Sequence, residues 1–142
     1  YEMIEGRGAV VRDGTDVVAI GYGPWLLSNA WHAAEHLADN SGVSLRVINL
    51  PWLNRIDGEW LREAIDGCGW VFALDNHYVH GGQGQMVLSK LAEMNCGGIR
   101  AGQIGLTEIP ECGGTAEVQK FHRLDSGSLA DWIAAAMQES SS

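Results

Sequence analysis

The chain has 142 residues, the usual length of one domain and enough to bury one hydrophobic core. Hydrophobic residues make up 46% of the chain, a globular value, and no apolar run approaches the roughly 20 residues that span a bilayer. Nine basic against eighteen acidic residues give a net charge of -9, which repels phosphate backbones and anionic lipids, so nucleic acid and membranes are excluded as expected partners.

Cysteine and tryptophan usage narrows the class further. Cys68, Cys96 and Cys112 are an odd number without C-x-x-C spacing, which favours reduced thiols in a cytoplasmic protein over a disulfide framework or a zinc site. Six tryptophans in so short a chain are typical of buried cores or of protein interfaces, so a partner surface is one expectation. The chain begins at Tyr1 without an initiator Met or signal-peptide pattern, so we expect a piece of a longer enzyme.

Strand-like segments alternate with helical patterns from the N-terminus onward. The predicted strands are residues 9–12, 16–20, 44–49, 70–74 and a shorter 99–101. The second and fourth are continuous apolar runs, typical of central strands covered on both faces in a parallel sheet. Asp13-Gly14 predicts a tight reversal, so the first strand should run antiparallel, in a hairpin with the second.

Apolar residues at helical spacing predict the connecting elements. The predicted helices are 24–40, 57–67 with Asp57 as N-cap, a third from Gly84 to Asn95, and a terminal helix from Ser126 or Ser128. Residues 103–122 should form an extended loop and a short helix from Thr115 to His122. The order predicts one domain over residues 1–139, an α/β/α sandwich, followed by a disordered tail at 140–142.

His32-Ala33-Ala34-Glu35-His36 matches the H-x-x-E-H pattern of inverted zinc proteases, in which two histidines one helical turn apart bind zinc. Such a site needs a third ligand and a cleft, whereas the alanines here indicate an ordinary packing face. Motif matches without structural context are mostly false positives, so we expect no metal site.

Gly21-Tyr22-Gly23-Pro24 follows a buried strand and opens a helix, where backbone N–H groups can hold an anion. A dinucleotide fingerprint would need a glycine where Leu26 stands. A tight strand-to-helix turn is the simpler interpretation.

The richest candidate site is the loop Asp75-Asn76-His77-Tyr78-Val79-His80-Gly81-Gly82-Gln83-Gly84. Asp75, His77 and His80 are side chains that ligate metals or transfer protons, and Gly82 and Gln83 complete its glycine-rich end. One short loop rarely supplies a whole site, so packing across an interface is the favoured role. In a doubly wound sheet this loop and the Gly21 turn should border one crevice at the carboxyl ends of the strands. No G-x-S-x-G nucleophile motif and no Walker lysine is present.

Seven segments combine in order along nearly the whole chain. They are the lead-in at 1–8, residues 10–17, 19–23, 30–37, 42–57, the 75–84 loop, and Phe121-His122-Arg123-Leu124-Asp125 with Leu129. Together they resemble the C-terminal domain shared by transketolase, deoxyxylulose-phosphate synthase and the beta subunit of 2-oxoacid dehydrogenases. Arg55, where the family usually has Pro, and Asp75-Asn76, in place of an acidic pair, are departures that leave the subfamily open. The C-terminal segment is most similar to transketolase and deoxyxylulose-phosphate synthase.

The resemblance implies a fold and a function. It implies a five-stranded, mostly parallel sheet whose antiparallel first strand lies beside the third strand, not in a hairpin with the second. It also implies a structural and dimerising domain of an enzyme that uses thiamine diphosphate and Mg2+ for two-carbon ketol transfer, with the cofactor in preceding domains or a partner subunit. We therefore expect no catalytic or cofactor-binding residue here, and an isolated domain without activity.

Three alternatives remain open at this point. One is a beta-subunit domain that docks another component of a 2-oxoacid dehydrogenase complex. A second is a regulatory module that binds a small ligand in the crevice. The third is the zinc protease suggested by His32 and His36.

Overall fold

Five strands and five helices follow one another through residues 2–139, the part of the chain that this computed structural model describes. The strands are β1 (Ala9–Arg12), β2 (Val17–Gly21), β3 (Leu45–Asn49), β4 (Trp70–Tyr78) and β5 (Arg100–Leu106). The helices are α1 (Pro24–Ser41), α2 (Gly58–Ala64), α3 (Gln83–Glu93), α4 (Thr115–Phe121) and α5 (Ser126–Glu139). The predicted tail at 140–142 lies outside the described residues. No helix in the described part of the chain is long and apolar enough to cross a membrane.

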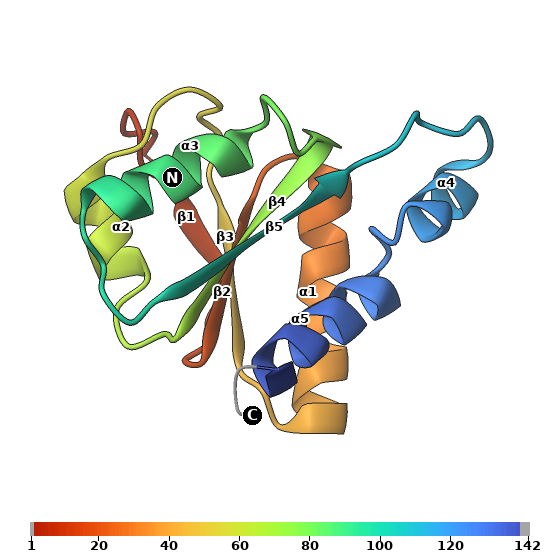
Figure 1. Cartoon of the computed structure of the whole chain (residues 1–142), viewed down its shortest axis with the longest axis horizontal. Helices are drawn as coiled ribbons and strands as arrows, with labels where there is room; N and C mark the ends of the chain where they lie inside the picture. Colours follow the sequence, from red (N-terminus) through yellow and green to blue (C-terminus); the bar gives the residue numbers. More distant parts are fainter. Residues whose placement is uncertain (1, 140–142) are drawn as a thin grey trace.

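The strands form one sheet in the order β1-β3-β2-β4-β5, in which β2, β3, β4 and β5 run parallel and β1 runs antiparallel to β3. Helices α2 and α3 lie on one side of the sheet, and α1 and α5 lie on the other (Figure 1). The predicted α/β/α sandwich with an antiparallel first strand is therefore confirmed.

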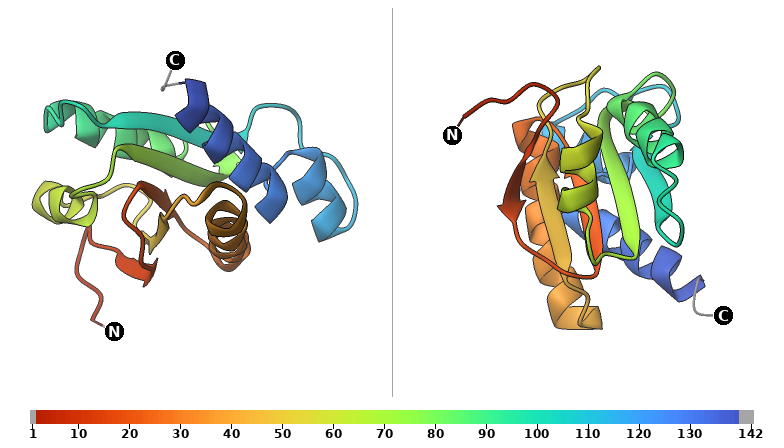
Figure 2. Two further views of the ribbon diagram at one scale, coloured as in Figure 1. Left: turned by 90° about the horizontal axis from the view of Figure 1, so that it is seen from below. Right: turned by 90° about the vertical axis from the view of Figure 1, so that its left-hand side faces the viewer.

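Two separate cores explain why the central strands are apolar along their whole length. Val17 and Ala19 of β2 pack with α1 and α5, whereas Val18 and Ile20 pack with α2 and α3. Successive side chains of a strand point to opposite faces, so a strand between two helix layers must be apolar at every position. Figure 2 shows this layering from two further directions.

The partner of β1 differs from the hairpin expected from Asp13-Gly14. β1 pairs with β3, so that Ala9 lies opposite Asn49, and it does not pair with β2. The reversal passes close to β3, because a Cβ on Gly14 would overlap the backbone nitrogen of Arg46. Asp13 accepts a hydrogen bond from Arg46 Nε at 3.2 Å. The local turn signal was correct, but the long-range partner was the one implied by the family resemblance.

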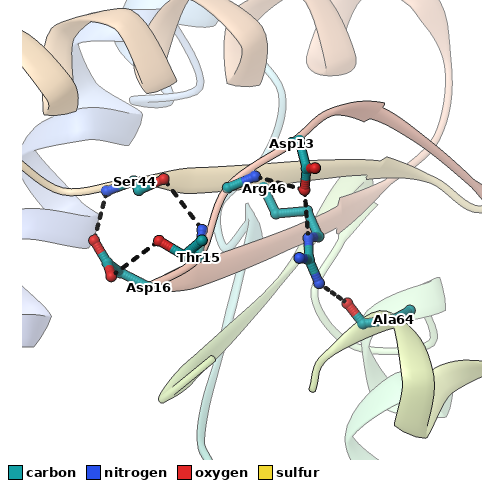
Figure 3. A network of polar contacts seen from close by, with 7 residues as sticks. Asp13, Thr15, Asp16, Ser44, Arg46 and Ala64 are labelled. Atoms are coloured by element: carbon teal, nitrogen blue, oxygen red, sulfur yellow. Dashed lines mark hydrogen bonds and ion pairs between the residues drawn. The ribbon is translucent and has the colours of Figure 1, made fainter. Parts of the chain in front are cut away.

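Polar contacts hold the starts of β2 and β3 in register (Figure 3). The Asp16 carboxylate accepts the Ser44 backbone N–H at 2.8 Å, and the Thr15 N–H donates to Ser44 Oγ at 3.1 Å. The Arg46 guanidinium donates to the Ala64 carbonyl at the end of α2 at 2.7 Å. Asp13 and Asp16, the acidic residues on either side of the Gly14 turn, therefore hold together the amino ends of the parallel strands. They lie at the opposite end of the strands from the loops at residues 21–23 and 75–84.

Two strands are longer than predicted. β4 continues through Asp75 to Tyr78, and β5 covers 100–106 where only 99–101 was expected. Tyr78 still pairs with Leu106 after an irregularity that follows Leu74. Polar and glycine residues in these extensions broke the apolar pattern, although the backbone ladder continues past them.

Candidate functional site

The two glycine-containing loops meet at the carboxyl edge of the sheet. Residues 21–23 lie at the carboxyl end of β2, and residues 75–84 run from the carboxyl end of β4 into the start of α3. β2 and β4 are parallel neighbours in the sheet. α1 leaves β2 toward one face, while α3 leaves β4 toward the other. This arrangement is the topological switch point of a doubly wound sheet, where ligands or partners commonly bind. The prediction that both loops border the same place is consistent with this geometry.

Tyr22 joins the two loops directly. Its hydroxyl donates to Asp75 Oδ1 at 3.5 Å, the outer limit of a hydrogen bond. Burial, followed by the negative charge of Asp75, raises the pKa of Tyr22, so the hydroxyl keeps its proton and remains a donor at neutral pH. Gly23 has a φ of 78°, a left-handed conformation that glycine adopts without strain just before Pro24 begins α1. The turn therefore contacts β4 through Tyr22.

Asp75 is the centre of the site and is fully buried. Its Oδ2 accepts the Gly84 backbone N–H at 2.9 Å and Gln103 Nε2 at 3.0 Å. None of the ion pairs in the described residues involves Asp75. A buried carboxylate without a cation depends on such hydrogen bonds to remain in place. Asp75 therefore connects β4, β5 and the start of α3.

The glycines of the loop make room for this carboxylate. A Cβ on Gly82 or on Gly84 would lie 2.6 Å from the Asp75 carboxyl group, a separation that real Cβ atoms do not show. A larger residue at either position would displace the carboxylate. The glycine pattern after β4 is thus a packing requirement of Asp75.

Gln83 extends the connections to a third strand. Its side chain is buried, and Nε2 donates to the Leu50 carbonyl at 2.7 Å and to the Trp52 carbonyl at 2.8 Å. Both amide hydrogens are therefore used to hold the segment that follows β3. Gln83 and Asp75 together join the carboxyl ends of β3, β4 and β5.

The two histidines of the loop lie apart from Asp75. His77 and His80 are exposed, and His77 Nδ1 is hydrogen-bonded to the Tyr78 carbonyl at 2.9 Å. Within residues 2–139, no group of three His, Cys, Asp or Glu side chains converges as a metal site would require. The structure thus does not bring Asp75, His77 and His80 together.

The polar residues of the H-x-x-E-H segment lie on the exposed face of α1, whereas Ala33 and Ala34 between them are buried in the core. His32 Nδ1 contacts Glu35 Oε2 at 3.1 Å, and Arg12 lies 3.7 Å from the same carboxylate. The hydrogen bond with His32, with a smaller contribution from Arg12, lowers the pKa of Glu35. His36 is also exposed. These contacts describe a solvated helix surface.

Two site residues were missed by the sequence analysis because they lie in the stretch predicted to be a loop. Gln103 donates to Asp75 and also to the Val79 carbonyl at 2.6 Å. A Cβ on Gly105 would lie 2.9 Å from the His77 carbonyl, so β5 approaches β4 closely here. The sequence signal that could have found this strand is the alternation of Gln103 and Gly105 with the apolar Ile104 and Leu106.

The N-terminal lead-in is attached near the same edge. Arg7 Nε donates to Asp57 Oδ2 at 2.7 Å, while Asp57 Oδ1 caps α2 by accepting the N–H groups of Glu59 and Trp60. The Trp60 N–H, followed by Arg7, lowers the pKa of Asp57. The lead-in borders a groove of about 600 Å³ with the 54–57 loop and α3.

The sequence matches the family described as "Transketolase, C-terminal domain" over residues 6–129, and the chain belongs to this family. It is 28% identical over 137 residues to one of the subunits of the apulose-4-phosphate transketolase of Actinobacillus succinogenes, a match that covers 92% of this chain and 42% of the relative. It is 32% identical over 137 residues to 1-deoxy-D-xylulose-5-phosphate synthase 1 of Geobacter sulfurreducens, covering 96% and 21%.

A solved structure has the same fold. The chain is similar to a split gene transketolase, described as an inactive beta4 tetramer, with a TM-score of 0.84 and 25% sequence identity. The match covers 97% of this chain and 44% of that one. The chain thus spans less than half the length of each of these relatives. The resemblance to the transketolase and deoxyxylulose-phosphate synthase superfamily is confirmed.

Proposed function

We propose that this chain is the C-terminal structural and dimerisation domain of a thiamine-diphosphate-dependent, transketolase-like enzyme. The intact enzyme transfers a two-carbon ketol unit, breaking one carbon–carbon bond next to a carbonyl group and forming another. The observation that carries the proposal is the family match over residues 6–129, in a chain whose polar groups at the carboxyl edge are bonded to one another. The names of the relatives, a transketolase subunit and a deoxyxylulose-phosphate synthase, support two-carbon transfer over the dehydrogenase alternative.

The residues of this domain do not fit the cofactor. Thiamine diphosphate supplies carbanion stabilisation, and its diphosphate is held through Mg2+, which prefers carboxylate and other oxygen ligands. Asp75 is the buried carboxylate at the switch point, and both of its oxygens already accept hydrogen bonds. We assign the cofactor to the preceding domains of the same enzyme or to a separate partner subunit, and derive no chemical step within this domain.

The role proposed for the domain is therefore structural, namely to support the other parts of the enzyme. The connections made by Asp75 and Gln83 hold three strand ends rigid, which suits a surface that supports other parts of an enzyme. A homodimer agrees with the exposed tryptophans Trp25, Trp31 and Trp132, because large aromatic residues are enriched at protein interfaces. The free cysteines support a cytoplasmic location.

The proposal is tested by calorimetric titration of the 142-residue chain with thiamine diphosphate and Mg2+, together with a ketol-transfer assay. We expect no binding heat and no transfer from a ketose phosphate to an aldose phosphate. An intact transketolase titrated and assayed under the same conditions is the positive control. Saturable binding or turnover by the isolated chain would show that the active site had been assigned to the wrong domain.

A further inference from the structure

Residues 107–123, here called the α4 arm, leave the end of β5 and project away from the sheet before α5 begins (Figure 1). Residues 107–117 are all exposed, and α4 has no buried residue. A helix of seven residues has little stability of its own in water and normally depends on packing of an apolar face. The apolar face of the arm therefore lacks a covering partner within residues 2–139.

The arm nevertheless has a defined conformation. Asn29 of α1 donates through Nδ2 to Gln119 Oε1 at 3.1 Å and to the Leu124 carbonyl at 2.9 Å. The Glu111 N–H donates to His122 Nε2 at 3.2 Å, which connects the two ends of the arm. Its exposed surface is thus presented in a fixed orientation, as a binding surface requires.

Apolar side chains and a cavity lie next to each other on the arm. Ile109 is 84% exposed and Phe121 is 58% exposed. Beside them a cavity of about 230 Å³ has a mixed lining, made by the apolar side chains of Val79, Phe121 and Trp132 and by polar side chains that include Glu108 and Arg123. An engineered apolar cavity of about 150 Å³ can hold benzene, so this cavity has room for one aliphatic side chain. The arm therefore carries both a protruding side chain and a hollow that fits one.

The charges of the arm also have both signs. Lys120 and Arg123 are basic and Glu108, Glu111 and Glu117 are acidic, and none of the five forms an ion pair within residues 2–139. Arg123 lies over the Trp132 ring, 5.7 Å from its centroid. Two copies of a chain with a net charge of -9 repel each other, unless opposite charges meet locally at their contact.

We infer that the α4 arm is the interface through which two copies of this chain dimerise. In a two-fold contact each copy offers the same patch, so Ile109 of one copy enters the cavity of the other and the reverse contact also forms. Lys120 and Arg123 of each copy then face the arm glutamates of the other. The inference rests on the homodimer proposed above and assigns it a surface. The arm with Trp132 approaches the roughly 20 to 30 residues that a standard interface uses on each side.

The test is the mass of the chain in solution from about 1 μM to 1 mM, the range of affinities typical of small interfaces. We expect the mass to rise from 15.3 kDa toward twice that value. Ile109→Asp should weaken dimerisation roughly tenfold or more, because it removes the apolar side chain that fills the cavity and replaces it with a carboxylate that must lose its hydration. Leu53→Asp is the matched control, since Leu53 is 55% exposed and lies outside the arm.

Cys112 supplies a readout that needs no interface variant. It is exposed within the arm, so its alkylation in the wild-type chain should slow as the concentration rises, whereas Cys96 should not change in this way. A chain that stays monomeric throughout would overturn the homodimer and this surface, but not the transketolase-type function. A dimer that survives Ile109→Asp and is lost in Leu53→Asp would retain the homodimer and refute the arm as its interface.

Discussion

Asp75 should be the residue of the carboxyl edge whose truncation is most damaging to stability. Its Oδ2 accepts two hydrogen bonds, from the Gly84 N–H and Gln103 Nε2, and its Oδ1 accepts one longer bond from Tyr22. Asp75→Ala removes all three bonds. It leaves the Gly84 N–H and one N–H of the Gln103 amide, the donors of the two shorter bonds, without their acceptor. Asp75→Asn can keep its amide oxygen at the Oδ2 position, while its NH2 group faces the Tyr22 hydroxyl, which is able to accept.

The magnitudes separate these two substitutions. A buried donor left unsatisfied costs about 1 to 3 kcal/mol, so Asp75→Ala should lower the free energy of unfolding by roughly 2 to 5 kcal/mol. Removing the carboxylate also removes the cost of burying a charge that has no cation beside it, which offsets part of this loss. The two donors remain unsatisfied. Asp75→Asn loses only the charge-assisted part of its bonds, about 1 kcal/mol.

Urea unfolding followed by tryptophan fluorescence measures the difference. With a slope of about 2 kcal/mol per molar urea, Asp75→Ala should unfold at a midpoint lower by roughly 1 to 2.5 M. Asp13→Ala is the control, because the side chain of Asp13 is 85% exposed and its ion pair should contribute little. If the Ala and Asn variants were equally stable, or if Asp75→Ala unfolded with the wild type, the hydrogen bonds would not be what Asp75 contributes.

Three further outcomes test neighbouring features. Gly84→Ala should destabilise the fold by about 1 to 3 kcal/mol in urea unfolding, because its Cβ would lie 2.6 Å from Asp75 Oδ2; an unchanged midpoint would contradict this. Asp57 has a pKa lowered from its ordinary 3.8, chiefly by the Trp60 N–H, so its stabilising contribution is present above about pH 4 and lost as pH falls through the folded pKa. The stability gap between wild type and Asp57→Ala should therefore narrow between about pH 7 and pH 3, and a constant gap would refute the linkage. Asn29→Ala should speed hydrogen exchange in the α4 arm more than in the central strands, and uniform acceleration would mean that Asn29 does not act as a local tether.

The candidate site was only partly predictable from sequence. The loop from Asp75 to Gly84 was singled out from the sequence because it is a polar and glycine-rich segment directly after a buried strand, and its role as a site stays a prediction. Asp75, His77 and His80 were its candidates for metal binding or proton transfer, with packing across an interface as the favoured role. The structure instead groups Asp75 with Tyr22, Gly84 and Gln103, which come from other elements. Hydrogen-bond partners that are 9 to 53 positions apart leave no periodic trace in the sequence.

Local pattern and composition alone determined the number and order of the strands and helices and the central position of β2 and β4, whereas the family came from the resemblance of seven segments in order along the chain. The physical reason is that burial on two faces demands apolar residues at every strand position, which can be read without knowing the neighbours. Only the tertiary structure decided that β5 continues through Gln103 and that α4 buries none of its residues against the described part of the domain. The pairing of β1 with β3 was implied by the family resemblance, but not by the local pattern around Asp13-Gly14. These features depend on contacts between segments that are distant in the sequence. The free energy of such a contact depends on both surfaces that meet, so neither segment alone reveals it.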